Sequence, residues 1–440
     1  MPDTQVKFES WGRYPLIASD VHPLQWSSDF ATGKLPSGDI LPVGAGRSYG
    51  DVCLLDHGTL LTTSGLDRLI DFNAQTGLLR CETGITLAQI LDFCVPQGYF
   101  LSVTPGTKHV SVGGAIANDI HGKNHHVAGT FGNCVLRFEL VRTDGQRLIC
   151  SPTENPEWFS ATIGGMGLTG LITWAELQLR PIVSRRISYI GEKFVGIDEF
   201  VALSRASAHL EYSVAWIDCV AAGRNFARGI FMLGEHSDQP EPLAPSRKPW
   251  LNFPVNLPEF ALNRNSVGLF NTLYYGKQFG KRTEALIDYE PFFYPLDSVL
   301  NWNRMYGKAG FLQFQCAIPW ESGTQTGITR ILEEIAKSGL ASFLAVIKVF
   351  GSVQSPGMMS FPIPGITLAL DFPIRQNLSF ALIKRLTAIT VEHGGKMYAA
   401  KDACMSPADF QAFYPQWEKF RQYVDPRINS ALWKRVTANV

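Results

Sequence analysis

Short apolar runs separated by glycine-rich turns dominate about the first 180 residues of the chain. The runs within DILPVGAG, GTLLTTSGL, GLLRCETG and VLRFELVRTDGQRLIC are typical of β-strands that end in turns. Residues 86–98 differ, because apolar side chains recur there at helical intervals from Leu87 to Cys94, and Pro96 with Gly98 ends the pattern. We therefore expect helices mixed with strands in this part of the chain.

The pattern changes after Pro181. Residues 236–250 are polar and proline-rich, which predicts a loop, and residues 250–294 then contain eleven aromatic side chains without a sustained period of 2 or 3.6. This aromatic segment is either an irregular cover over a core or a mobile lid that touches an apolar ligand. Strand-like runs return in FLQFQCAIPW, ASFLAVIKVFG and ITLALDFPI, and residues 379–395 predict a helix closed by two glycines.

Composition narrows the classes of protein to consider. The 440 residues are 45% hydrophobic and 18% charged, which is globular composition and enough for roughly two or three domains of about 150 residues. Lys+Arg and Asp+Glu are equal at 39 each, so we expect no nucleic-acid partner. The apolar runs are far shorter than the ~18 residues of a membrane span, and we expect a cytoplasmic protein. Eight dispersed cysteines without zinc-type spacing favour reduced, buried thiols.

The first segment with candidate chemistry is LPVGAGRSYGD, residues 41–51. Its three glycines, Gly44, Gly46 and Gly50, follow a predicted strand and let backbone approach a ligand closely. Successive amides in such a loop can form an anion-binding nest that suits a pyrophosphate. A plain tight turn is the alternative interpretation of this loop taken alone.

Two further glycine-rich segments follow, at residues 104–133 and 163–181. Glycines in series with small residues indicate backbone pressed against a flat ligand. His121, His125 and His126 lie in the first of these segments, but no acidic or cysteine partner stands at a ligand spacing, so we expect no metal. The three segments together are much more specific than any one of them.

In this order and spacing, the segments resemble the FAD-binding domain of the vanillyl-alcohol-oxidase superfamily. GGAIANDIHGKNHHVAGTFGN, with GAGRSYGD upstream and MYAAKDACMSPADFQAFYPQWEKFRQYVDP downstream, resembles the decaprenylphosphoryl-β-D-ribose oxidase family over essentially the whole chain. The resemblance implies an α+β fold of two lobes. Residues 1–183 and 396–440 would form a PCMH-type FAD-binding domain, and residues 184–395 an antiparallel-sheet substrate-binding (cap) domain with flexible loops at about 236–300.

The resemblance also assigns roles residue by residue. Positions that match flavin contacts are Ala45, Gly46, Arg47, Ser48, Tyr49, Gly50, Gly106, Thr107, Gly113, Gly114, Ala115, Asn118, Ile120, His121, Gly122, Gly170, Ile172 and Tyr398. Positions that match catalytic groups are Lys401, Tyr49, His121 and Gln315, and positions that match substrate contacts are Lys123, Lys348, Thr367 and Ala369. Without that context, a lone Lys401 would more often be a solvated surface charge, and Gln315 on an alternating strand would usually face solvent.

The chain departs from the family at one segment. Family members studied for inhibition carry Asn-x-Cys before an Asp-Phe-Pro, where this chain has Thr367-Leu368-Ala369. The departure bears on substrate and inhibitor preference and leaves the flavin-contacting positions unchanged. Flavin-tethering superfamily members place a histidine before the serine of the first loop, where this chain has Arg47, so we expect non-covalent FAD.

The implied function is FAD-dependent oxidation of the 2-hydroxyl of a polyprenylphosphoryl-β-D-ribose to the 2-keto sugar by hydride transfer to flavin N5. This is the first half of an epimerisation that makes the arabinose donor for cell-wall arabinan. A separate NAD(P)H-dependent short-chain reductase would complete it, since no GxGxxG follows a strand in this chain. A lipid-linked substrate implies peripheral contact with the inner face of the cell membrane.

The sequence leaves open two alternative functions and, for the implied oxidation, two possible roles of Lys401. The alternatives are a soluble alditol or sugar-acid oxidase of the same superfamily and a flavin-binding subunit without catalysis. In the implied oxidation, Lys401 would either stabilise the developing oxyanion or accept the hydroxyl proton, and the second role needs a depressed pKa.

Overall fold

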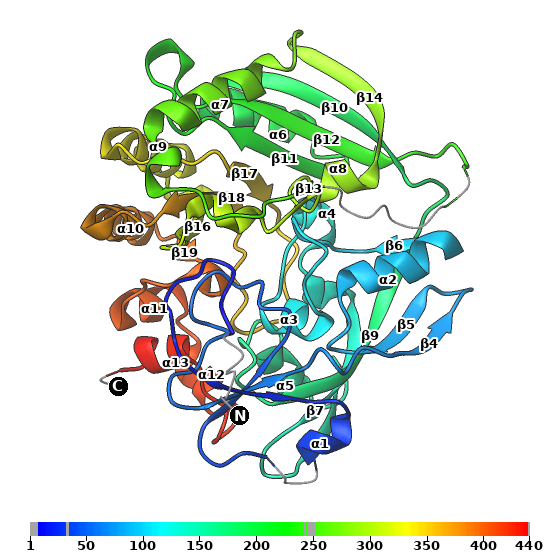
Figure 1. Cartoon of the computed structure of the whole chain (residues 1–440). Coiled ribbons are helices and arrows are strands. Elements are labelled where there is room, and N and C mark those ends of the chain that lie inside the picture. Colours follow the sequence, from blue (N-terminus) through cyan, green and yellow to red (C-terminus); the bar gives the residue numbers. More distant parts are fainter. Residues whose placement is uncertain (1–7, 32–34, 242, 244–250, 439–440) are drawn as a thin grey trace.

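The structure, a computed structural model, describes residues 8–31, 35–241, 243 and 251–438. Figure 1 shows a lower lobe, built from the first 180 residues and the C-terminal helices, beneath a large twisted sheet flanked by helices. Helices and strands are mixed throughout, so the predicted α+β fold is confirmed.

Two sheets organise the lower lobe. A small parallel sheet has the order β1-β3-β2, and a larger one has the order β4-β5-β9-β7-β8 with β6 beside β9. The strands are β1 (Asp20–Pro23), β2 (Ile40–Val43), β3 (Thr59–Thr62), β4 (Leu69–Asn73), β5 (Leu78–Glu82), β6 (Tyr99–Leu101), β7 (Val135–Val141), β8 (Arg147–Cys150) and β9 (Leu171–Pro181). The strands predicted from the four glycine-bounded runs are therefore confirmed.

Helix α2 (Leu87–Cys94) confirms the helix predicted in residues 86–98. Thr86 caps it and exchanges hydrogen bonds with Gln89 in a capping box, which satisfies amides that the first turn leaves free. The helix ends through a 3-10 turn at Gly98, whose φ of 82° lies in the left-handed region. The other helices of this lobe are α1 (Ser27–Ala31), α3 (Val112–Ala117), α4 (His125–Ala128), α5 (Pro156–Thr162), α11 (Pro407–Phe413), α12 (Trp417–Arg421) and α13 (Ala431–Val436).

An eight-stranded antiparallel sheet forms the upper lobe, in the order β14-β10-β12-β11-β17-β18-β16-β19. Its strands are β10 (Arg186–Val195), β11 (Tyr212–Ile217), β12 (Arg228–His236), β14 (Arg282–Asp288), β16 (Phe311–Pro319), β17 (Ala345–Phe350), β18 (Gly365–Pro373) and β19 (Lys396–Met397). Because β19 pairs with β16, this sheet extends past residue 395, where we expected the lobes to change.

The two faces of this sheet have different neighbours. Helices α6 (Ile197–Ala206), α9 (Thr324–Ser338) and α10 (Gln376–Glu392) cover one face, and α10 begins three residues before the predicted helix. Phe314 and Cys316 of β16 belong to the apolar core on that side. Side chains alternate along a strand, so Gln313 and Gln315 point to the opposite face, which is left for the candidate site.

The aromatic segment is more regular than we expected. Residues 264–276 form α7 (Arg264–Gly276), β14 adds an edge strand to the sheet, and α8 (Tyr289–Phe293) follows. A capping box of Asn263 and Ser266 starts α7, although the helix buries only two of its side chains and so has a weak apolar period. Of the predicted 236–250 loop, residues 242 and 244–250 lie outside the described residues. The two-residue strands β13 (Leu251–Asn252) and β15 (Val299–Leu300) pair with each other.

Arg435 of α13 ties the first glycine-rich loop to the segment that follows β19. One nitrogen of its guanidinium, Nη2, lies 2.8 Å from Oδ1 of Asp51 and 2.8 Å from Oδ2 of Asp402, and both carboxylates are almost fully buried. Burial lowers the pKa of Arg435, but the two acids together outweigh burial and raise that pKa above its ordinary value, so the cation persists. Asp51 ends the first glycine-rich loop and Asp402 follows Lys401, so this clamp sets Lys401 beside Tyr49.

Candidate active site

A cavity of about 1370 Å³ lies between the lower lobe and the free face of the eight-stranded sheet. Drug-sized ligand pockets hold about 300–1,000 Å³, so this cavity has room for a dinucleotide together with a substrate. Sequence-predicted site residues that line it are Ala45, Gly46, Arg47, Ser48, Tyr49, Gly106, Thr107, Gly113, Gly114, Asn118, Ile120, His121, Gly122, Lys123, Gly170, Ile172, Gln315, Lys348, Thr367, Ala369, Tyr398 and Lys401. The fold thus gathers segments that are hundreds of residues apart.

Two expected cofactor contacts, Gly50 and Ala115, do not line the cavity. A Cβ on Gly50 would lie 1.5 Å from the carbonyl oxygen of Asp402, so this glycine lets the first loop pack against the C-terminal segment. Ala115 is fully buried in α3, inside the apolar core of the lower lobe. Both residues shape the walls that other residues present to the cavity.

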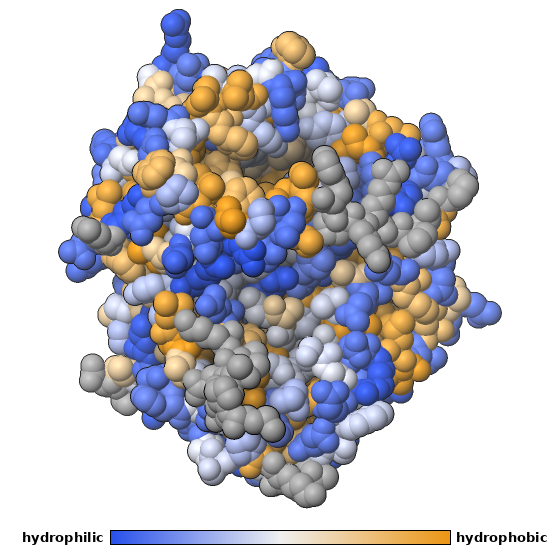
Figure 2. All heavy atoms as spheres, in the orientation of Figure 1, coloured by the Kyte–Doolittle hydropathy of each residue, from blue (hydrophilic) through white to orange (hydrophobic). Residues whose placement is uncertain are grey.

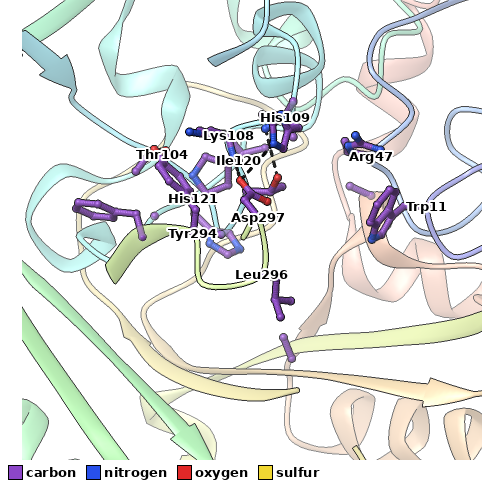
Figure 3. A pocket seen from close by; sticks show the side chains of 18 of the residues that line it. Trp11, Arg47, Thr104, Lys108, His109, Ile120, His121, Tyr294, Leu296 and Asp297 are labelled. Atoms are coloured by element: carbon purple, nitrogen blue, oxygen red, sulfur yellow. Dashed lines mark hydrogen bonds and ion pairs between the residues drawn. The ribbon is translucent and has the colours of Figure 1, made fainter. Parts of the chain in front are cut away.

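The first loop offers unpaired donors to the cavity. The backbone amides from Ala45 to Ser48 donate no hydrogen bond to another described residue, and Gly46 has a φ of 62°. Orphaned amides in a row are costly unless a ligand accepts from them, and a pyrophosphate does so well. The guanidinium of Arg47 lies 4.3 Å above the ring of Trp11, on the wall shown in Figure 3, where it can pair with a phosphate. These residues fit the FAD pyrophosphate.

His121 is fixed by partners on both ring nitrogens. Lys348 Nζ lies 2.7 Å from His121 Nδ1 and donates to the Gly122 carbonyl at 2.9 Å. The side-chain amide nitrogen of Gln315 lies 3.0 Å from His121 Nε2 and also donates to Thr367 Oγ1 at 3.3 Å, and which ring nitrogen of His121 carries the proton depends on the protonation of Lys348. Burial and Lys348 hold the pKa of His121 well below its usual value, so the ring is neutral.

Lys401 lies against Tyr49 at the other side of the same space. Its Nζ is 3.8 Å from the centroid of the Tyr49 ring, a favourable position for a cation. Burial lowers the pKa of Lys401 to about 8, and the carboxylate of Asp371 opposes that shift. Tyr398 and Lys401 both reach the cavity because residues Ala399–Lys401 form a 3-10 turn, which brings together side chains that an extended strand would separate.

Lys123 completes a group that we call the lysine chamber, defined by Lys123, Lys348 and Lys401 with His121 and Gln315. Lys123 Nζ donates to the Phe293 carbonyl at 3.1 Å and lies 5.8 Å from the rings of Phe292 and Phe293. Burial lowers the pKa of Lys123 to about 8. Burial also lowers the pKa of Lys348 well below its usual value, and repulsion from Lys123 and Lys401 lowers it further. Buried cations that repel one another make a chamber suited to an anionic ligand.

The structure rejects the surface interpretations of Gln315 and Lys401. Gln315 is 4% exposed and also hydrogen-bonds Thr367 Oγ1 at 3.3 Å, and Lys401 faces the cavity. His125 is buried outside the cavity lining, and His126 contacts the Leu210 carbonyl at 2.8 Å, so these two support the loop. No group of three or more His, Cys, Asp or Glu side chains in the described part of the chain could hold a metal.

Sequence reasoning missed Gln313, Asp371 and Asp297. Gln313 donates to the Asp371 carboxylate and is a hydrogen-bond partner of Tyr49, so it connects the cavity wall to a fully buried acid. Its position two residues before Gln315, on the same face of β16, was the available signal. Asp297 accepts from the Lys108 amide at 2.8 Å beside His109, as Figure 3 shows, and no local pattern marks it.

Comparison with known proteins agrees with this geometry. A family model described as an FAD binding domain matches residues 36–151. Decaprenylphosphoryl-β-D-ribose oxidase of Mycolicibacterium smegmatis is 33% identical, with 97% of this chain and 95% of that protein covered. An uncharacterized protein of Streptomyces coelicolor is 30% identical over 78% of this chain and 96% of its own. Cytokinin dehydrogenase 8 of Oryza sativa subsp. indica is 28% identical over 34% of this chain and 30% of its own.

Substitutions at Gly50 and Gly106 can test the packing of the first loop separately from contact with the cofactor. We expect Gly50→Ala to lower the free energy of unfolding by about 1–3 kcal/mol or more, because its methyl group meets backbone that cannot move freely. Gly106→Ala is the matched control, since nothing lies within 4 Å of its Cβ. It should leave the melting temperature of the apoprotein unchanged and lower the FAD bound per chain, measured by absorbance. Equal losses of melting temperature would contradict this division.

Proposed function

The chain belongs to the decaprenylphosphoryl-β-D-ribose oxidase family and is an FAD-dependent oxidoreductase, and we propose that it oxidises the 2-hydroxyl of a polyprenylphosphoryl-β-D-ribose to the 2-keto sugar. The observation that carries the proposal is the lysine chamber, which opens directly onto the cavity lined by the first glycine-rich loop. FAD, when bound, supplies the hydride acceptor at this site. A separate NAD(P)H-dependent reductase of the product would complete the epimerisation to the arabinose donor.

The residues of the lysine chamber have different roles toward the substrate. Gln315 and the neutral His121 offer fixed hydrogen-bonding groups that orient the sugar, and Tyr49 with Lys401 forms the opposite wall. Lys123 and Lys348 are placed to hold the phosphate. Ala369 pairs with Gln315 on one side and Val346 on the other, so its small side chain leaves room between them.

We assign Lys401 the role of a cation that stabilises the substrate oxyanion. The Asp371 carboxylate and the face of the Tyr49 ring both favour its charged form. As the carbinol hydrogen leaves, the hydroxyl oxygen becomes more acidic and negative charge grows next to Nζ. An electrostatic contact of this kind strengthens toward the transition state and therefore raises turnover.

The direct test is anaerobic reduction of the yellow holoenzyme by candidate substrates. Farnesylphosphoryl-β-D-ribose should bleach the flavin absorbance in a single turnover, whereas xylitol and sorbitol at the same concentration should not. Bleaching by the free alditols alone would support a soluble alditol oxidase. Absence of bleaching by any sugar would favour a flavin-binding subunit without catalysis.

Lys401→Met should lower the rate of anaerobic flavin reduction by ~100-fold or more, as for other transition-state contacts.

Because Lys401 loses its proton as the pH rises through about 8, the wild-type rate of anaerobic flavin reduction should fall above that pH. Lys401→Arg keeps its charge to higher pH, so its lower residual rate should show no such fall. A wild-type rate that rises through pH 8 would instead make Lys401 the base. A Lys401→Met rate within a few-fold of wild type would remove Lys401 from the mechanism.

FAD should be held without a covalent bond. Arg47 occupies the position before Ser48, and its guanidinium can pair with a phosphate but cannot form a bond to the flavin ring. Acid or heat precipitation of the holoenzyme should release all the yellow colour into the supernatant. Colour that remains with the precipitate, or a protein mass increased by that of FAD, would contradict this.

We propose that the protein meets the lipid surface through α7 and the turn after it, although no helix in the described ranges is long and apolar enough to cross a bilayer. Leu269 and Leu273 of α7 are 63% and 66% exposed, and Phe279 is fully exposed at the cavity edge. Figure 2 shows apolar side chains around a hollow in this upper lobe. The zero net charge predicts weak binding that changes little with salt.

The double variant Leu273→Ser and Phe279→Ser should reduce cosedimentation with phosphatidylcholine vesicles several-fold. Leu378→Ser, which removes a 46% exposed side chain from α10, is the matched control and should bind like wild type. Equal binding by all three proteins would show that this surface does not meet the membrane.

A further inference from the structure

The free face of the eight-stranded sheet changes in character across the strand order. Gln313, Gln315 and Thr367 of β16 and β18 are polar, and Lys348 of β17 follows. Beyond it, Val346 of β17, Val214 of β11, Met232 of β12 and Ile287 of β14 line the same cavity. We call the part of the cavity lined by Val346, Val214, Met232, Tyr189 and Ile287 the apolar arm.

The register of the sheet makes this change continuous. Lys348 stands opposite Thr367, and Met232 stands opposite Val214 on one side and Gly191 on the other. Strands lie ~4.8 Å apart, so the five steps from β18 to β14 span roughly 24 Å. The cavity therefore continues from the lysine chamber along the sheet for the length of several isoprene units.

Among the described residues, the polar groups over the apolar arm contact other parts of the chain. Tyr274, Lys277, Gln278 and Phe279 line it from α7 and the turn that follows. Lys277 Nζ lies 3.6 Å above the Tyr274 ring, and the Gln278 amide donates to three backbone carbonyls, of which that of Gly191 is at 3.1 Å. With these polar groups engaged, the arm selects an uncharged hydrocarbon.

We propose that the apolar arm is the binding site of the isoprenoid tail of the substrate, with the phosphate between Lys123 and Lys348. The proposal rests on the proposed function, because it places the remainder of the same lipid-linked sugar. Lys348 and Val346 are neighbours on one face of β17, so a ligand that continues past the phosphate meets the arm at once. The far end of the arm reaches the exposed Phe279, where a longer tail leaves the protein.

Isothermal titration of the holoenzyme with dimethylallyl, geranyl, farnesyl and geranylgeranyl phosphate tests this site without any oxidation. Affinity should rise by at least ~10-fold per added isoprene unit until the arm is filled. Met232→Trp fills the arm and should flatten this gradient while leaving dimethylallyl phosphate unaffected. Met232→Leu, the matched control, should keep the gradient. Val346→Phe narrows the arm near its start and should also flatten the dependence of affinity on chain length. This variant provides the test if Met232→Trp does not fold.

A wild-type gradient that persists in both arm-filling variants, or no gradient in wild type, would overturn the proposal. The readout separates it from the proposed function, because these phosphates carry no ribose. If the phosphates bind with an affinity that depends on chain length, but farnesylphosphoryl-ribose does not bleach the flavin, the tail site is supported and the proposed reaction is rejected. If farnesylphosphoryl-ribose bleaches the flavin, but affinity does not depend on chain length, the reaction is supported and the tail site is rejected.

Discussion

Three lysine side chains share one buried chamber, and the arrangement of the site follows from keeping them there. Burial penalises each charge and the cations repel one another, so each needs a different partner. Lys348 uses His121 Nδ1 and the Gly122 carbonyl, Lys123 uses the Phe293 carbonyl, and Lys401 uses the Tyr49 ring near Asp371. None of these partners neutralises the whole group. An anionic ligand does, which relates the electrostatics of the chamber to a phosphorylated substrate.

The clamp at Arg435 shows how the fold positions that chamber. Asp51 and Asp402 each end a segment that carries a site residue, Tyr49 in one and Lys401 in the other. Two buried carboxylates would repel without the guanidinium, which pairs with both. The backbone supports the same junction, since the Tyr49 amide donates to the Ala400 carbonyl at 3.2 Å. The chamber therefore depends on a C-terminal helix that touches neither sugar nor flavin.

Local features of the fold could be predicted from the sequence, and non-local pairings could not. The capped helix α2 and the glycine-bounded strands depend on neighbours in the chain, so their patterns predict them. Helix α7 was not predicted because much of it is exposed and its apolar pattern is weak. Strand β19 was not predicted because its pairing with β16 depends on a distant segment of the chain. The glycine-rich loops marked the cofactor side by composition. Gln313 and Asp371 gain their importance only from the register of β16 and β18.

Proton uptake on binding tests the central claim that a phosphorylated sugar neutralises the lysine chamber. Farnesylphosphoryl-2-deoxyribose has the phosphate but no 2-hydroxyl, so it binds without being oxidised. Titration calorimetry of the holoenzyme at pH 8, in buffers of different ionisation enthalpy, measures the protons exchanged. The pKa values of Lys123 and Lys401 lie at about 8, and a bound anion raises them, so the account predicts net proton uptake. Binding with no proton exchange, or with proton release, would contradict it.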